Sequence, residues 1–119
     1  MKKTLVLGAS ENPARYGYKA IQALRRKGHP VVAVGRRQGA VLDVDIEKEK
    51  VPFDDVDTVT MYMNADNQEE YIDYILNLKP KRIIFNPGAE NYKLEHLARE
   101  KGIETMDACT LVLLSIGKY

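Results

Sequence analysis

The stretch that decides the fold is "VLGASENPARYG", which runs from Val6 to Gly17. An apolar run leads into Gly8-Ala9-Ser10, and an amphipathic pattern begins after the insertion "ENPAR". Small residues at a strand-to-helix turn let a ligand approach the backbone, and the free amides and dipole of a helix start favour an anion. The stretch therefore predicts a strand, a loop that binds phosphate or pyrophosphate, and a helix. A bare strand-to-helix turn is the alternative interpretation.

The remaining chain alternates short apolar runs with segments of helical period, which is typical of a parallel α/β sheet. The pattern predicts a three-layer, Rossmann-like α/β fold with a five-stranded, mainly parallel sheet. We expect a single domain over residues 1–119, because this length suits one domain. The expected strands are residues 3–7, 30–34, 58–63, 82–85 and 103–106, each followed by a helix except the second.

The segment from Gln38 to Asp57 is harder to assign. Its first part, "AVLDVDI", alternates like a short exposed strand, and "EKEKVPFDD" is typical of a loop with Phe53 as an anchor. After the third expected strand, Asp66 and Glu69 have the spacing of a capping box and predict the start of a helix.

The composition excludes several classes of protein. With 18 basic and 17 acidic residues the net charge is +1, which argues against a dedicated nucleic-acid binder. No apolar stretch approaches the roughly 18 residues that span a bilayer, and the run in "MKKTLVLGAS" is too short for a signal peptide, so we expect a cytoplasmic protein without membrane contact. A single cysteine, Cys109, and two distant histidines, His29 and His96, predict neither an internal disulfide nor a metal site.

Three loops follow the carboxyl ends of expected strands. They contain Gly8-Ala9-Ser10, Gly35-Arg36-Arg37 and Asn86-Pro87-Gly88. In an open parallel sheet, ligands bind at this edge, near the point where the strand order reverses. We therefore expect the loops to converge on one ligand, and the candidate binding residues are Gly8, Ala9, Ser10, Arg15, Tyr16, Gly17, Gly35, Arg36, Arg37, Asn86, Pro87 and Gly88.

The residue types narrow the class of ligand. No Gly-Lys-Ser/Thr follows the first loop, so it is not a Walker P-loop, and Ser10 occupies the second glycine position of the dinucleotide fingerprint. Proteins that bind NAD place an acidic residue after the second strand, where this chain has Arg36 and Arg37. Guanidinium groups suit a phosphate on the ribose, as in NADP or coenzyme A (CoA), although a solvated basic turn is the alternative. No histidine lies near Cys109 in sequence, so we expect no catalytic residue.

These motifs resemble a known family. The stretch "GASENPARYGYKAIQALRRKGHPVVAV" is similar to the opening of the small CoA-binding domain proteins, and "NPGAEN" and "AREKGIETMDAC" resemble later parts of the same family. That family is Rossmann-like and related to the nucleotide-binding part of the succinyl-CoA synthetase α subunit. The resemblance implies that Gly8, Ala9 and Ser10 lie against the CoA pyrophosphate, with Arg15 as the basic residue of the loop and Pro87 and Gly88 beside the ligand.

The chain departs from the family pattern at two points. The family commonly ends its second strand with Val-Asn-Pro, whereas this chain has Val34-Gly35-Arg36-Arg37, and Asn86 stands where a glutamine is usual. Three hypotheses follow from the sequence. The first is a CoA- or acyl-CoA-binding protein without catalysis of its own. The second is an NADP-binding oxidoreductase or redox sensor, and the third is a regulatory protein whose nucleotide site is degenerate.

Overall fold

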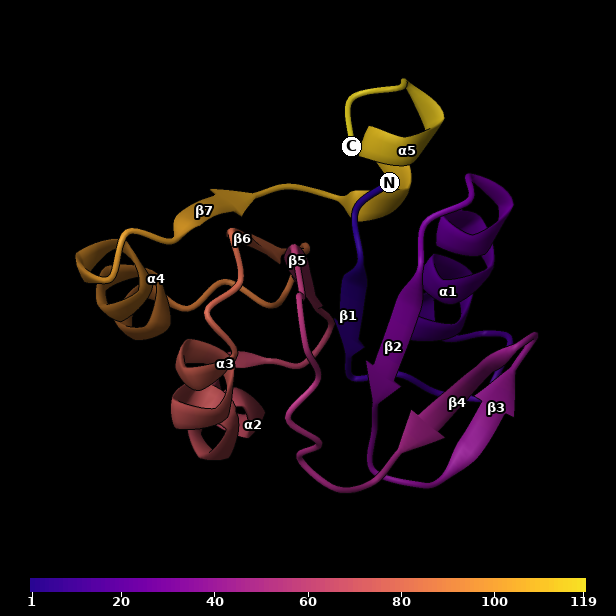
Figure 1. The fold of residues 1–119 in the computed structure, drawn as a ribbon, viewed down its shortest axis with the longest axis horizontal. Coiled ribbons are helices and arrows are strands. Elements are labelled where there is room, and N and C mark those ends of the chain that lie inside the picture. Colours follow the sequence, from indigo (N-terminus) through magenta and orange to yellow (C-terminus); the bar gives the residue numbers. More distant parts are fainter.

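The computed structural model describes all residues from Met1 to Tyr119. In chain order the elements are β1 (Thr4–Leu7), α1 (Tyr16–Arg26), β2 (Val31–Val34), β3 (Gly39–Val41), β4 (Val44–Glu47), β5 (Thr58–Met61), α2 (Ala65–Gln68), the 3-10 helix η1 (Glu69–Tyr71), α3 (Ile72–Leu78), β6 (Arg82–Phe85), α4 (Tyr92–Glu100), β7 (Glu104–Asp107) and α5 (Thr110–Ser115). The chain forms seven strands, and helices follow β1, β5, β6 and β7 (Figure 1).

All seven strands form one sheet in the order β3-β4-β2-β1-β5-β6-β7. Every neighbouring pair is parallel except β3 and β4, which are antiparallel. The prediction of a three-layer, mainly parallel α/β fold is confirmed, and the prediction of five strands is wrong. From β1 the chain first builds outward through β2 and β4 and then returns to the other side of β1 with β5. The strand order therefore reverses between β1 and β5.

The two additional strands come from the segment that the sequence pattern left as one short exposed strand. A turn at Leu42 and Asp43 divides it, so that Val41 pairs with Val44 across a hairpin. Leu42 has a φ of +54°, which is unusual for a leucine, and the turn lacks the Asn-Gly or Asp-Gly signal that marks most such hairpins. Arg25 on α1 holds this turn, because its guanidinium donates to both carboxylate oxygens of Asp43 at 3.0 and 2.8 Å.

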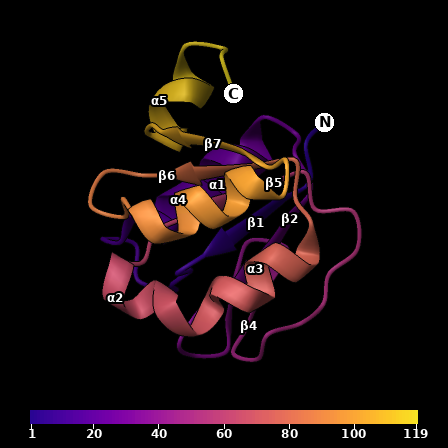
Figure 2. The ribbon, with the colours of Figure 1, turned by 90° about the vertical axis from the view of Figure 1, so that its left-hand side faces the viewer.

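The helices cover both faces of the sheet (Figures 1 and 2). Successive side chains of a strand point to opposite faces, so Leu5 and Leu7 join one core and Val6 joins the other. The core with Leu5 and Leu7 lies under α3 and α4, where Ile75 and Leu94 are fully buried. The core with Val6 is closed by α1 and α5 and is smaller. Apolar burial on both faces accounts for the near-continuous hydrophobic strands.

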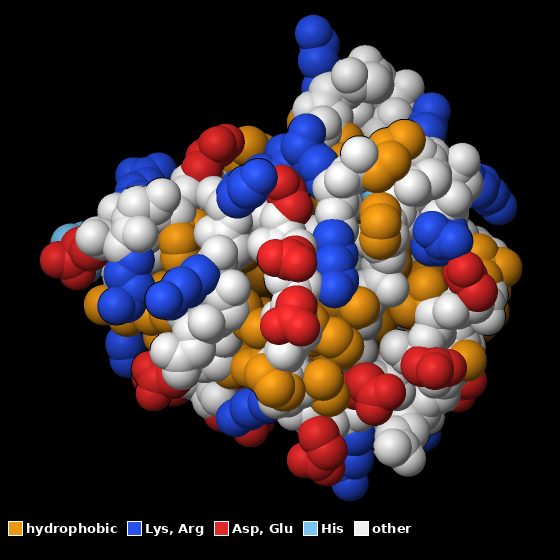
Figure 3. Space-filling model, viewed as in Figure 1, with side chains coloured by type: hydrophobic (Ala, Val, Ile, Leu, Met, Phe, Trp, Pro, Cys, Tyr) orange, Lys and Arg blue, Asp and Glu red, His pale blue; other side chains and the backbone are white.

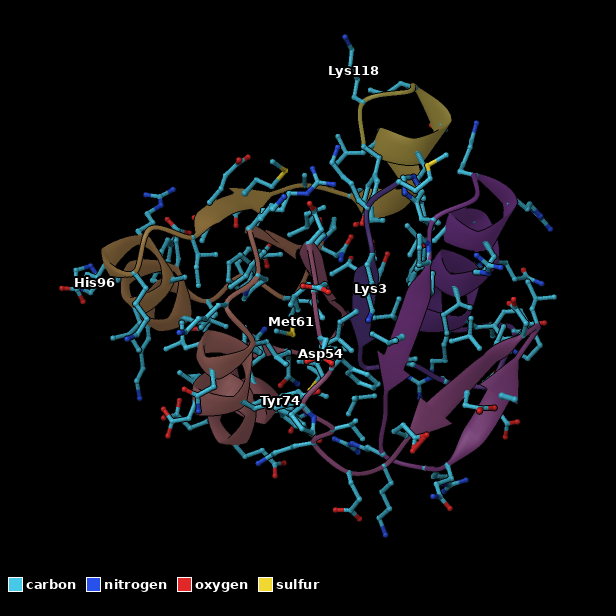
Figure 4. The ribbon with its side chains drawn as sticks, viewed as in Figure 1. Lys3, Asp54, Met61, Tyr74, His96 and Lys118 are labelled. Carbon is cyan, nitrogen blue, oxygen red and sulfur yellow. The ribbon has the colours of Figure 1, made fainter.

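An extended segment, not a helix, links β4 to β5. Residues 48–57 run back to the start of β5, and Phe53 packs against the larger core, as the sequence predicted. Tyr74 of α3 reaches toward this segment and its hydroxyl donates to Val51 O at 2.5 Å (Figure 4). Lys3 fixes the second half of this segment, because its ammonium donates to Asp54 O at 2.6 Å.

The start of the helix after β5 differs from the sequence prediction. Asn64, and not Asp66, is the N-cap residue of α2, and its side-chain oxygen accepts a hydrogen bond from Asn67 N at 2.9 Å. The predicted capping box is wrong because the helix begins one residue before Asp66. Asn64 is an equally favourable cap, since its short amide reaches the free backbone N–H groups of the first turn.

The two chain ends meet at the amino-terminal edge of the sheet (Figure 1). The Tyr119 ring lies 4.4 Å from the Arg82 guanidinium, and its hydroxyl shares a hydrogen bond with the Thr4 hydroxyl. Arg82 is buried and donates through Nε to Thr58 Oγ1 at 2.7 Å, but its Nη2 has no partner. The cation–π interaction with the Tyr119 ring therefore offsets part of the free-energy cost of burying the Arg82 guanidinium. Burial lowers the pKa of the neighbouring His29, and the positive amino terminus, Lys2 and Arg82 lower it further.

The outer surface carries no concentration of one charge on the face seen in Figure 3, where basic and acidic side chains are interspersed. His96 projects from the outer side of α4, away from the sheet (Figure 4). None of the helices combines the length and the apolar character that crossing a bilayer requires.

Substituting Tyr119 tests its role over Arg82. Tyr119→Ala should lower the free energy of unfolding by about 2–3 kcal/mol, because both the ring contact and the hydrogen bond are lost. Tyr119→Phe keeps the ring over the guanidinium and should cost about 1 kcal/mol, which is the usual contribution of one hydrogen bond. Urea denaturation measures both values. Equal losses in the two variants would show that the ring over Arg82 contributes nothing.

Candidate ligand-binding site

A cavity with a volume of about 940 Å³ opens at the carboxyl edge of the sheet. It lies where the strand order reverses, between the loops that follow β1 and β5. Ten of the twelve candidate residues line it, namely Gly8, Ala9, Ser10, Arg15, Tyr16, Gly17, Arg36, Arg37, Pro87 and Gly88. The volume falls within the range of about 300–1,000 Å³ that is usual for small-molecule sites.

Glycines allow the first loop to lie tightly between α1 and β2. Gly8 has a φ of +96°, and the amides of Gly8 and Ala9 both donate to Val34 O, at 2.9 and 3.1 Å. A Cβ atom at Gly17 would lie 2.5 Å from Gly8 O, and one at Gly35 would collide with Ala9 O. The loop backbone is thus fixed from both sides, and any larger residue at these two glycines would displace it.

Helix α1 presents free hydrogen-bond donors to the cavity. No side chain caps its amino terminus, and the amides of Tyr16, Gly17 and Tyr18 have no partner within the protein. The Ser10 hydroxyl accepts from Asn12 N at 3.0 Å, which leaves its own hydrogen available for donation. Because Tyr16, Gly17 and Ser10 line the cavity, this wall combines unpaired N–H and O–H donors with the positive end of a helix dipole.

Three arginines surround these donors. Arg15, Arg36 and Arg37 are exposed and line the cavity, and their side chains form no ion pair or hydrogen bond with the protein. The single carboxylate of the cavity belongs to Glu11, and it accepts a hydrogen bond from Ala40 N at 2.9 Å. This half of the cavity therefore has an excess of positive charge and suits an anion that carries more than one phosphate.

The opposite wall carries no charged group. It is formed by the loop after β5, the first turn of α2 and the loop after β6, with Tyr62, Met63, Asn64, Asn67, Pro87, Gly88 and Ala89. The sequence reasoning included the loop after β6 and missed the loop after β5. The sequence could have indicated this loop, because "NADN" (residues 64–67) follows the strand predicted at residues 58–63 and must therefore lie at the same edge of the sheet.

Two candidate residues lie behind the cavity and do not line it. Gly35 is buried under the first loop, as described above. Asn86 is also buried, and its side-chain amide donates to Thr60 Oγ1 and Met61 O at 2.8 and 2.9 Å. Its oxygen accepts from Thr110 N at 2.8 Å. The Asn86 side chain thus joins β5, β6 and the start of α5, and it has no free donor for a ligand.

Cys109 precedes α5 and does not line the cavity. Tyr62 does line it, but its hydroxyl is buried and lacks a partner, and burial raises the pKa of this phenol above its ordinary value. A phenol in such surroundings stays protonated. The structure brings together no group of three or more histidine, cysteine, aspartate or glutamate residues that could hold a metal ion.

Comparison with known proteins identifies the family of this chain. The sequence profile of the family described as "CoA binding domain" matches residues 2–115. The chain belongs to the CoA binding domain family. No curated protein matches it significantly.

Several solved structures are similar to this CoA binding domain. One is described only as the crystal structure of an uncharacterized protein. Its sequence is 50% identical to this chain, and the two structures superpose with a TM-score of 0.97 over 100% of this chain and 98% of the other. A hypothetical protein from Pyrococcus horikoshii OT3 has 21% identity and a TM-score of 0.83, and the match covers 93% of this chain and 80% of that protein. A dinucleotide-forming acetyl-coenzyme A synthetase 1 of Ca. Korarchaeum cryptofilum, in complex with phosphate and ADP, has 19% identity and a TM-score of 0.71. This match covers 90% of this chain and 25% of the synthetase chain. The last two likenesses concern the fold alone.

Gly17 offers a test of how the first loop is built. Alanine normally stabilises a helix relative to glycine by about 0.5–1 kcal/mol, but here its Cβ would press on Gly8 O. Gly17→Ala should therefore lower the free energy of unfolding, by about 1–3 kcal/mol, in urea denaturation. Lys19→Ala, on the exposed side of the same turn, is the control and should change stability by less than about 0.5 kcal/mol. A more stable Gly17→Ala protein would refute the close packing.

Proposed function

We propose that this protein binds CoA or an acyl-CoA in the cavity and that its function is binding, without catalysis of its own. The observation that carries the proposal is the group of three unpaired arginines around the free amides of α1. Membership of the CoA binding domain family names the class of ligand.

The donors of the first loop fit a diphosphate. Gly8, Ala9 and Ser10 would lie against it, the amides of Tyr16 and Gly17 would donate to its oxygens, and Arg15 would neutralise its charge. Since these amides have no protein partner, an anion would take up hydrogen bonds that otherwise go to water.

Arg36 and Arg37 lie at the end of β2, across the first loop from α1. In the proposed complex they bind the 3′-phosphate of the CoA ribose, because guanidinium groups bind phosphates through paired N–H donors. The same pair would suit the 2′-phosphate of NADP, which keeps an NADP-binding oxidoreductase or redox sensor as the second candidate.

The uncharged wall fits the remaining part of CoA. The pantetheine arm has amides and a thiol but no charge, and this wall offers Asn64, Asn67 and backbone groups beside Met63 and Ala89. No histidine, lysine or cysteine lines the cavity, and the Glu11 carboxylate is bound to backbone. The proposal therefore assigns binding alone to these residues.

A thermal-shift screen tests the ligand class. The purified protein is measured with CoA, acetyl-CoA, NAD, NADP and ATP. A ligand at about 100 times its dissociation constant should stabilise the native state by roughly 2.7 kcal/mol. We expect this stabilisation with CoA or acetyl-CoA. Stabilisation by NADP and not by CoA would replace the proposal with the second candidate, and no stabilisation by any of the five would favour a regulatory protein with a degenerate site.

The arginine pair has its own test. Arg36→Ala combined with Arg37→Ala should weaken CoA about tenfold or more, whereas dephospho-CoA, which lacks the 3′-phosphate, should lose much less affinity. Isothermal titration calorimetry gives both dissociation constants. Arg26→Ala combined with Lys27→Ala is the matched control, since it removes two exposed cations from the far end of α1. Equal losses for the two ligands would show that the pair does not bind the 3′-phosphate.

A further inference from the structure

The uncharged wall of the cavity is built from two loops that are distant in sequence. The loop after β5 supplies Met63 and Asn64, and the loop after β6 supplies Pro87, Gly88 and Ala89. Beyond the strand ends, something must hold these loops at a fixed separation if the wall is to receive one ligand. One buried side chain, that of Gln68, is hydrogen-bonded to both loops.

Gln68 is the last residue of α2 and is fully buried. Its side-chain nitrogen donates to Met63 O at 2.8 Å and to Ala89 O at 2.7 Å, so one amide group is bonded to both loops. Both hydrogens of the amide are used. Because two backbone carbonyls can only accept, the nitrogen and not the oxygen of the amide must face them.

Asn91 fixes the other end of the same amide. Its nitrogen donates to Gln68 Oε1 at 2.9 Å, while its oxygen accepts from Leu94 N at 3.1 Å and caps α4. A buried polar network with every member paired has one low-energy arrangement, which gives it rigidity. An exposed ion pair between Lys93 and Glu69, at 2.5 Å, links α4 to η1, but it lies in solvent and contributes little to stability.

We propose that Gln68 is the positioning residue of the uncharged wall, and that it holds the loops after β5 and β6 in the geometry that receives the neutral arm of the ligand. The inference rests on the proposed function, because it takes that arm to be pantetheine. Gln68 itself does not line the cavity, and acts through the backbone of Met63 and Ala89, which do.

The test compares CoA with a ligand that lacks this arm. CoA would extend over both halves of the cavity, whereas adenosine 3′,5′-bisphosphate lacks pantetheine and the phosphate that carries it, and would contact only the arginine side. Gln68→Met keeps an unbranched side chain of similar length and removes the hydrogen bonds. It should weaken CoA about tenfold and leave adenosine 3′,5′-bisphosphate within about twofold, measured by calorimetry well below the melting temperature.

Two further variants separate positioning from general stability. Thr4→Val removes a buried hydroxyl at the opposite edge of the sheet, where Thr4 is bonded to Tyr119 and Lys2 O. It should lower the melting temperature and leave both dissociation constants unchanged. Asn91→Asp keeps the oxygen that caps α4 but loses the donor to Gln68 Oε1, and it should weaken CoA in the same selective way. This second variant serves if Gln68→Met does not fold.

The outcomes are distinct. Selective weakening of CoA in Gln68→Met or Asn91→Asp supports the proposal. Equal weakening of both ligands, or no weakening of either, overturns the positioning role while leaving the proposed function intact. Wild-type protein that binds neither ligand overturns the proposed function and the inference with it.

Discussion

The close approach of three backbone segments around Gly8 and Ala9 determines how the rest of the site is built. The loop after β1 lies between α1 and the end of β2, and each neighbour contributes a glycine where a side chain would collide. Two hydrogen bonds to Val34 O then fix the loop to β2. Because the loop cannot move outward, the start of α1 is held with its free amides at the cavity. A phosphate site at this loop, as proposed, would be formed by backbone positions, so few side chains would be needed to define it.

Because of the strand order, this loop lines a cavity whose two halves differ in charge. The chain builds β2 and β4 on one side of β1 and β5 to β7 on the other, so loops from both sides meet at the β1–β5 boundary. The arginines come from the first two loops, whereas the residues that line the cavity from the loops after β5 and β6 are uncharged. A ligand with an anionic end and a neutral end matches this division, and a compact dianion would use only half of the cavity.

The sequence predicted the parts of this structure that depend on local pattern. Apolar runs located the five core strands, and the glycines and arginines located the loops at their ends. The pattern did not reveal the β3–β4 hairpin, because Leu42 adopts its positive φ without the usual turn residue. It also did not show that Asn86 turns inward, because an asparagine beside Pro-Gly is equally typical of an exposed turn. That orientation depends on Thr60 and Thr110, which are distant in sequence. The burial of Gln68 could not be predicted for the same reason, because nothing in the polar stretch "DNQEE" distinguishes a buried residue from an exposed one.

The unpaired arginines are unfavourable for the free protein. Positive charges near the amino terminus of a helix oppose its dipole, and three guanidinium groups around one cavity repel one another. Exposure to solvent reduces this cost but does not change its sign. A multiply charged anion would remove both penalties at once, and its own hydrogen bonds would satisfy the amides of α1. Arg25 and Arg82 are compensated within the protein, by Asp43 and by the Tyr119 ring. In the proposed complex the ligand would give the three arginines of the cavity the compensation that the protein does not give them.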